Sequence, residues 1–196
     1  PSLLVLVDSK RHGSRRTRVA PSGTRDSSLR ITRSPSTSPS VTSMVRIQDI
    51  INPYDSDVYR QLAGGLTVVN VLHGSANAIG GQDVNTKLKH GQAGRDLILD
   101  DDRRPQGVKF ALGENVTRRR DRFPNTRMGV EATIERAFLE GRAYAEVRKA
   151  HEQAKARGET APPFRRDLRL EALARIVDGS IKIHSYCYRS DEILML

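Results

Sequence analysis

The sequence predicts an α/β protein built around a parallel sheet. Two short apolar, β-prone runs, residues 108–112 and 181–188, flank a long stretch with helical spacing of apolar residues. An earlier β-branched run, residues 66–72, follows a shorter helical stretch. Strands that alternate with helices in this way are typical of βαβ units, in which helices connect parallel strands. A chain of 196 residues is long enough for one domain with its own core.

The globular part is predicted to begin at Met44. Asp55 suits the start of a helix and Gly64-Gly65 its end, which predicts a helix over residues 56–63. The run at 66–72 has the near-continuous β-branched character of a strand buried on both faces of a parallel sheet. A loop is expected from His73 to Gln82. Residues 84–89 and 96–99 are expected as short strands, either of an inserted hairpin or of a third barrel strand.

The second half of the chain predicts two helices between two strands. Residues 108–112 read as a buried strand, and residues 127–157 as a long helix that Gly158 and Pro162-Pro163 end. Asp167 is placed to cap a shorter helix over residues 168–177. The last predicted strand covers residues 181–188.

The N-terminal segment, residues 1–43, is expected to be a separate, disordered region rich in Arg, Ser and Pro. Its Ser34–Ser40 run is typical, and such a composition buries too little apolar surface to offset the entropy of ordering. Eight cationic residues against two acidic ones give this segment a net charge of +6 out of the chain's +10. A natural basic tail and a frame-shifted gene end are both open readings. The remainder, residues 44–196, is expected to be one globular unit.

Composition narrows the classes of function. No run of 18 or more apolar residues exists, so no membrane-spanning helix is expected. Leu3–Val7 is too short for the apolar region of a secretory signal, so no signal peptide is expected and the compartment stays open. The single cysteine, Cys187, excludes an internal disulfide. The net charge alone invites a nucleic-acid partner, but interleaved aromatics and a recognisable nucleic-acid module are lacking, so that reading is kept only as an alternative.

Three segments resemble the imidazolonepropionase-like branch of the metal-dependent amidohydrolase superfamily. They are Leu72-His-Gly-Ser-Ala-Asn-Ala-Ile-Gly-Gly-Gln82, Gly107-Val-Lys-Phe-Ala-Leu-Gly-Glu-Asn115 and Ile181-Lys-Ile-His-Ser-Tyr-Cys-Tyr-Arg189. The resemblance runs from about Val41 to Leu196. It implies a partial (β/α)8 TIM barrel, about strands 2–5, because a complete barrel needs roughly 250 residues.

The resemblance also implies a metal site and a substrate-binding mouth. Lys109 and His184 match strand positions that ligate a divalent metal, most often Zn²⁺, in the full-length family. A lysine inside an apolar strand also faces a desolvation cost that lowers its pKa, which favours reaction of the neutral amine with CO2. A lysine that pairs with Glu114, and a hydrogen-bonded structural histidine, are the alternatives for these two positions. The expected substrate-binding residues are His73, Ser75, Asn77, Gln82, Tyr188 and Arg189.

The family's remaining ligands and its catalytic Asp have no counterpart in the sequence. Val7-Asp-Ser-Lys-Arg-His12 stands where two strand-1 histidines are expected, and the matching ends before the later strands. The sequence therefore predicts a fragment of a hydrolase that acts on C–N bonds of amides, cyclic amides or peptides. No catalytic residue is assigned in it, and the chain alone is expected to be inactive. A non-catalytic barrel-like scaffold is the other alternative.

Overall fold

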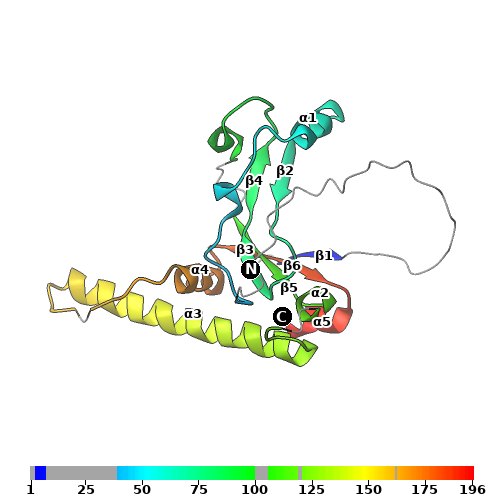
Figure 1. The fold of residues 1–196 in the computed structure, drawn as a ribbon. Helices are drawn as coiled ribbons and strands as arrows, with labels where there is room; N and C mark the ends of the chain where they lie inside the picture. Colours follow the sequence, from blue (N-terminus) through cyan, green and yellow to red (C-terminus); the bar gives the residue numbers. More distant parts are fainter. Residues whose placement is uncertain (1–2, 8–38, 100–105, 119–120, 162) are drawn as a thin grey trace.

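The computed structural model of this chain describes residues 3–7, 39–99, 106–118, 121–161 and 163–196. These residues form a mixed α/β fold with two sheets (Figure 1). The larger sheet has the strand order β1-β6-β5-β3, and β2 and β4 form a separate pair. The strands are β1 (Leu3–Val7), β2 (Val68–Val71), β3 (Ile79–Gln82), β4 (Val84–Lys87), β5 (Gly107–Ala111) and β6 (Lys182–Cys187). Within the described part of the chain the larger sheet is open, and no closed barrel is present.

The centre of the larger sheet is the parallel pair of β5 and β6. Lys109 lies opposite His184 in this pair, and β1 continues the sheet in parallel on the far side of β6. All five residues of β5 are buried, as expected for a short, largely apolar central strand. The prediction of strands near 108–112 and 181–188 is therefore confirmed, and so is their parallel pairing.

The strand predicted at 66–72 is present, but its expected parallel, fully buried position is wrong. β2 pairs antiparallel with β4, apart from the larger sheet, and none of its residues is fully buried. One side of this strand pair packs on the short 3-10 helix η1 (Ile47–Asp49) and on α1 (Ser56–Ala63), around an apolar cavity of about 250 Å³. A β-branched run fits such a half-covered strand pair as well as a central strand, so composition alone does not distinguish the two.

Two further segments differ from the expected pattern. The loop expected up to Gln82 ends in a strand, because β3 is fully buried and pairs antiparallel with β5. Residues 96–99 do not form a strand of their own: η2 (Gly94–Leu97) is a 3-10 helix, and only Ile98 bridges to Thr86 of β4. The antiparallel partner of β4 is thus β2, and β3 of the larger sheet lies between the two in the chain.

The predicted helices are confirmed, and so are the N-terminal caps expected at Asp55 and Asp167. The Asp55 side chain accepts a hydrogen bond from the Asp57 N–H at 2.9 Å at the start of α1, which ends at Gly64. Thr126 caps α3 (Arg127–Ala156) through the Gly129 N–H, and Asp167 caps α4 (Leu168–Val177) through the Leu170 N–H. Two short helices, α2 (Glu114–Thr117) and α5 (Ser190–Met195), follow β5 and β6.

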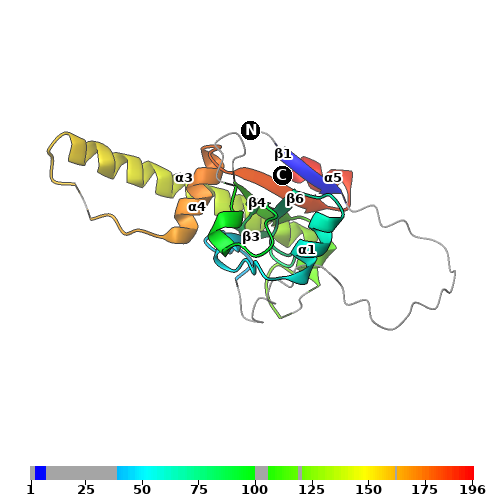
Figure 2. The same cartoon turned by 90° about the horizontal axis from the view of Figure 1, so that it is seen from above.

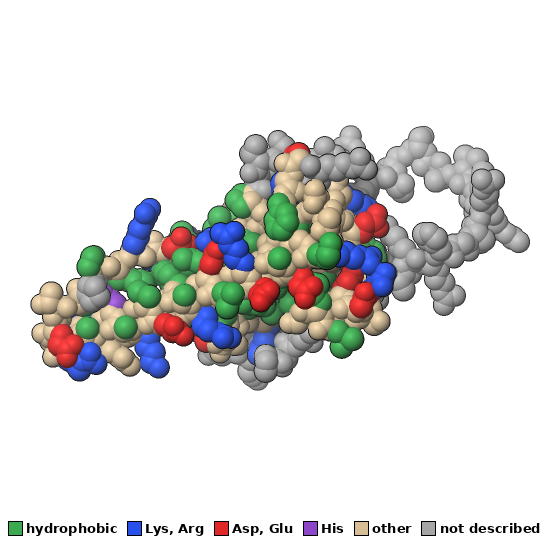
Figure 3. All heavy atoms as spheres, turned by 90° about the horizontal axis from the view of Figure 1, so that it is seen from below, with side chains coloured by type: hydrophobic (Ala, Val, Ile, Leu, Met, Phe, Trp, Pro, Cys, Tyr) green, Lys and Arg blue, Asp and Glu red, His purple; other side chains and the backbone are tan. Residues whose placement is uncertain are grey.

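α3 and α4 cover one face of the larger sheet (Figure 2). Phe110 of β5 stacks on Phe138 of α3 with ring centroids 6.0 Å apart, and Val108, Val130, Leu173 and their neighbours form one buried cluster between the layers. The far end of α3 extends beyond the sheet (Figure 1). The face of the molecule seen from below shows apolar side chains among charged ones (Figure 3). Met128, Leu139 and Val147 are exposed apolar residues of α3.

Parts of the N-terminal segment belong to the fold. β1 lies at the edge of the larger sheet, and residues 39–43 are ordered beside β3, where Val41 bridges to Ile79. The Ser43 hydroxyl also donates to the Arg169 carbonyl at 3.0 Å. The described structure thus includes residues 3–7 and 39–43, which precede the expected boundary at Met44. Residues 8–38 lie outside the described residues, so the expectation of disorder stays a prediction there. No described helix combines the length and hydropathy needed to cross a membrane.

Candidate functional site

Lys109 and His184 lie side by side at the centre of the larger sheet. They are register partners on the parallel strands β5 and β6. Side chains alternate between the faces of a strand, so Lys109, His184 and Tyr186 share the face opposite Phe110, which packs on α3. The Lys109 Nζ atom lies 5.0 Å from the centroid of the Tyr186 ring. The fold therefore brings together the two residues for which the sequence suggested metal ligation.

Burial changes the chemistry of Lys109. The residue is 5% exposed, and desolvation lowers the pKa of its amine, against the opposing influence of Asp83 and Cys187. The direction agrees with the expectation from the sequence. Pairing with Glu114, the alternative, is not what the structure shows, because the Glu114 carboxylate faces Arg118 at 3.5 Å. A lysine in these surroundings is a better nucleophile toward CO2 than an exposed one.

The residue that sequence reasoning missed at this site is Asp83. Its carboxylate is fully buried and contacts Nδ1 of His184 through one oxygen. The other oxygen accepts the Gly107 N–H at 2.8 Å and the Asn70 side-chain N–H at 3.4 Å. Asp83 lies in the single-residue link between β3 and β4, where no strand or helix pattern draws attention to it. An Asp close to two strands was the only available signal.

Gly107 makes room for this contact. A Cβ atom at position 107 would lie 2.5 Å from the Asp83 carboxylate and 2.6 Å from the His184 ring, distances that side chains do not tolerate. The backbone of the same residue binds Asp83 twice, since the Gly107 carbonyl also accepts the Asp83 N–H at 2.9 Å. Glycine is required here because the carboxylate and the imidazole approach the β5 backbone so closely.

The two side chains point toward different ends of the strands. The His184 ring lies beside Gly107, the first residue of β5, whereas the Lys109 amine reaches Tyr186, further along β6. His184 therefore does not point to the C-terminal strand ends, where (β/α)8 barrels carry their sites. The cause is Asp83, whose buried carboxylate holds the imidazole on the N-terminal side.

The His73 ring packs against Gly80 and Gly81, the two glycines of β3. Its ring atoms are the nearest neighbours of a Cβ built at Gly80, at 2.9 Å, and lie 3.3 Å from one built at Gly81. Its Nδ1 atom is 2.8 Å from the Gly74 carbonyl oxygen. The pairing of β3 with β5 shifts register between Ile79 and Gln82, so both glycines that approach the ring lie at an irregularity of the strand.

The other three candidates from this segment bind the protein itself. The buried Asn77 side chain donates to Thr42 at 2.7 Å and accepts from Arg122 at 2.8 Å. Gln82, 8% exposed, donates to the Ser43 carbonyl at 3.0 Å. The Ser75 hydroxyl accepts from Asn115 at 2.7 Å. These contacts tie β3 to residues 39–43 and to α2, and their role in substrate binding stays a prediction.

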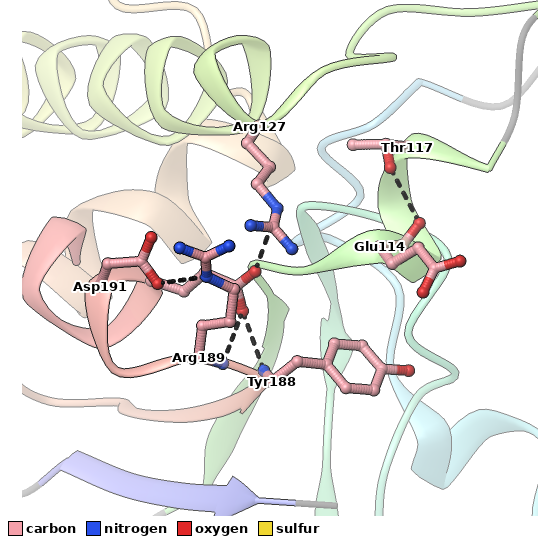
Figure 4. A network of polar contacts seen from close by, with 7 residues as sticks. Glu114, Thr117, Arg127, Tyr188, Arg189 and Asp191 are labelled. Atoms are coloured by element: carbon pink, nitrogen blue, oxygen red, sulfur yellow. Dashed lines mark hydrogen bonds and ion pairs between the residues drawn. The ribbon is translucent and has the colours of Figure 1, made fainter. Parts of the chain in front are cut away.

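A second polar group lies at the C-terminal end of β6 (Figure 4). The carboxylate of Glu192, only 4% exposed, accepts the backbone N–H groups of Tyr188 and Arg189 at 2.8 and 3.3 Å. Its other oxygen lies 3.5 Å from Arg127 of α3. The Arg189 guanidinium makes an exposed ion pair with Asp191 at 2.8 Å, and the Tyr188 hydroxyl lies 3.2 Å from that of Tyr186. The predicted substrate contacts Tyr188 and Arg189 are thus part of the turn into α5.

The described residues do not provide a complete set of ligands for a metal ion. Among the described residues no three His, Cys, Asp or Glu side chains are placed to hold one ion. Lys109 and His184 supply two donors at most, while catalytic zinc sites have three protein ligands. Burial raises the pKa of the Cys187 thiol, which disfavours its thiolate form as a further ligand.

Comparison with known proteins identifies relatives for most of the chain. No family model matches it. It is 30% identical over 171 residues to "Amidohydrolase tasK" of Hapsidospora irregularis, covering 80% of this chain and 17% of that protein. It also matches the crystal structure of an amidohydrolase from Thermotoga maritima MSB8, with a TM-score of 0.69 and 33% identity, over 82% of this chain and 40% of the other. The chain thus spans under half the length of either protein, and by sequence and fold it is a relative of proteins named amidohydrolases.

Proposed function

We propose that this chain is part of a metal-dependent amidohydrolase of the imidazolonepropionase-like branch, in which it forms a portion of a (β/α)8 barrel. The observation that carries the proposal is the structural match to an amidohydrolase at 33% identity and a TM-score of 0.69. The reaction class is hydrolysis of a C–N bond in a small amide, cyclic amide or peptide. A divalent metal supplies an activated water and a polarised carbonyl in such enzymes.

The residues of this chain fit a part of that site. The imidazole of His184 and the amine of Lys109, whose pKa burial lowers, are suitable donors on adjacent strands. Their divergent directions and their small number explain why no step of hydrolysis is assigned to this chain alone. We therefore expect weak metal affinity and no hydrolytic activity from the isolated chain.

A non-catalytic scaffold is the second candidate function. The observation in its favour is the contact between His184 and Asp83, which turns the ring away from the C-terminal strand ends where barrel enzymes carry their sites. In that case Lys109 and His184 are relics of an ancestral site.

A calorimetric titration with Zn²⁺ distinguishes the two. The proposed function predicts binding weaker than micromolar that decreases in His184→Ala and is unchanged in His90→Ala, a control whose ring instead contacts Tyr59. Binding that is micromolar or tighter and is abolished by His184→Ala would mean that the site is more complete than proposed. Absence of binding favours the scaffold. A panel of amide and dipeptide substrates, assayed with Zn²⁺, is expected to show no turnover.

A further inference from the structure

Asp83 is placed to determine which ring nitrogen of His184 carries the lone pair. One of its carboxylate oxygens faces Nδ1 of the imidazole, and the residue is 2% exposed, so water does not compete for this contact. A carboxylate only accepts hydrogen bonds, so the ring nitrogen that faces it must carry a proton. The neutral imidazole then has its lone pair on Nε2, the nitrogen that this contact does not use.

The carboxylate itself is held by two hydrogen-bond donors from other parts of the fold. Gly107 donates its N–H at 2.8 Å and Asn70 its amide at 3.4 Å to the oxygen that does not face His184. Asn70 is in turn positioned by Asn85, since its amide also donates to the Asn85 side chain at 2.9 Å. Donors from β2 and β5 therefore fix the rotation of the Asp83 carboxylate independently of His184.

We propose that Asp83 is the positioning residue of His184: it fixes the neutral ring as the Nδ1–H tautomer and presents Nε2 as the electron-pair donor on the Lys109 face of the sheet. The metal consequence of this assignment rests on the proposed function, because histidine ligands commonly donate their second ring nitrogen to a carboxylate that sets their orientation. The tautomer itself depends on the geometry of this chain alone.

An Asp83→Asn substitution gives the assignment a sharp test. Gly107 and Asn70 both donate to the same oxygen of Asp83, so only the carbonyl oxygen of the new amide can take its place there. The amide nitrogen must then face Nδ1 and donate to it, so the neutral ring is forced into the Nε2–H tautomer. The substitution keeps the shape of the side chain and inverts the tautomer.

The experiment is a ¹⁵N NMR measurement of the histidine ring nitrogens in the full chain at neutral pH. The wild-type protein is expected to show His184 as Nδ1–H with a bare Nε2, and Asp83→Asn to show the reverse. His73 is the internal control, because its Nδ1 faces the Gly74 carbonyl and does not contact Asp83. An Nε2–H, doubly protonated or rapidly averaging His184 in the wild type overturns the proposal, even where the variant fails to fold.

A Zn²⁺ titration of the same two proteins separates this inference from the proposed function. Asp83→Asn is expected to weaken Zn²⁺ binding about 10–100-fold, in the range seen for partners of metal-bound histidines. Inversion of the tautomer with unchanged Zn²⁺ affinity overturns the role of Asp83 toward a metal. Failure of the wild-type protein to bind Zn²⁺ contradicts the proposed function, and the tautomer measurement then decides the inference by itself.

Discussion

At the scale of single residues, the site is decided by a carboxylate that no sequence pattern marks. Lys109 and His184 are found as neighbours because each lies in a short β-prone run, and parallel strands align such residues. Asp83 reaches His184 over 101 positions of sequence, and only the pairing of β3 with β5 brings the two together. The direction of the His184 ring was unpredictable for that reason, since it depends on a contact between elements.

Gly107→Ala is expected to destabilise the protein by about 1–3 kcal/mol, the usual cost of overpacking. The new methyl group would lie 2.5 Å from Asp83 and 2.6 Å from His184, so the carboxylate or the ring must move. Urea unfolding measures the change in free energy.

Gly74→Ala is the matched control for this substitution. A Cβ at Gly74 meets nothing within 4 Å, so its effect is expected to stay within about 0.5 kcal/mol. Equal stabilities of the two variants would show that the close contact around Gly107 does not exist in solution.

At the scale of elements, local signals predicted the helices and long-range pairing decided the strands. The boundaries of α1, α3 and α4 follow from Asp55, Thr126 and Asp167 and from glycines near their ends, all of which act within one turn. β3 was missed because half of its four residues are glycine, a residue depleted in strands, and because its burial comes from β5 and residues 41–46. The pairing of β2 with β4 equally depends on partners that the local run does not specify.

The contact of α3 with α4 includes a carboxylate whose charge should matter to stability. Glu140 of α3 accepts from Arg169 of α4 at 2.7 Å and from Arg136 at 2.9 Å. The hydrogen bond with Arg169 is the main reason that the pKa of Glu140 lies below its usual value of 4.5. A lowered carboxyl pKa contributes stability at pH values above 4.5, and this contribution disappears as the pH falls through the folded-state pKa.

Glu140→Gln is therefore expected to cost about 0.2–1 kcal/mol at neutral pH, the range of partly exposed ion pairs. The difference from the wild type should shrink as the pH is lowered below 4.5. Urea unfolding at a series of pH values gives both quantities. Glu146→Gln, an exposed change on the same helix, is the control and should show neither effect. A difference that stays constant with pH would contradict the role of the charge.

Gly141→Ala tests how closely the same two helices approach. A Cβ at Gly141 would lie 2.8 Å from Leu173 Cβ and 3.0 Å from its backbone, so the added methyl group should push α4 away. The gain in helix propensity of about 0.5–1 kcal/mol is smaller than the expected overpacking cost of about 1–3 kcal/mol. A net loss in thermal or urea stability is expected, and a gain would mean that the helices lie further apart.

At the scale of the whole molecule, the chain combines a well-packed layer, the larger sheet with its helices, with a thinly packed one, the pair of β2 and β4. The larger sheet with α3 and α4 contains the main buried cluster, whereas the two-stranded sheet of β2 and β4 encloses only a small apolar cavity with η1 and α1. An isolated pair of strands is marginally stable in water, so its stability must come from this limited contact. The site residue Asp83 lies at the boundary between the two layers, since it follows β3 and precedes β4.

Hydrogen exchange should therefore divide the molecule into two parts. Amides of β5 and β6 are expected to exchange slowest, near the rate of global unfolding, because these strands lie in the centre of the core. Amides of β2 should exchange faster through local opening of the two-stranded sheet, since none of the residues of β2 is fully buried. Exchange followed by mass spectrometry on peptides from each strand measures this difference.

β3 is the matched control for β2, because both strands have four residues but β3 is fully buried and pairs within the larger sheet. Slow exchange in β3 with fast exchange in β2 would locate the weak boundary at Asp83, the one residue between β3 and β4. Whenever the two-stranded sheet opens, Asn70 would leave with β2, and only the Gly107 N–H would then hold the Asp83 carboxylate in place against His184. Equal protection of β2 and β3 would instead show that the two layers unfold as one unit and that Asp83 is held from both sides throughout.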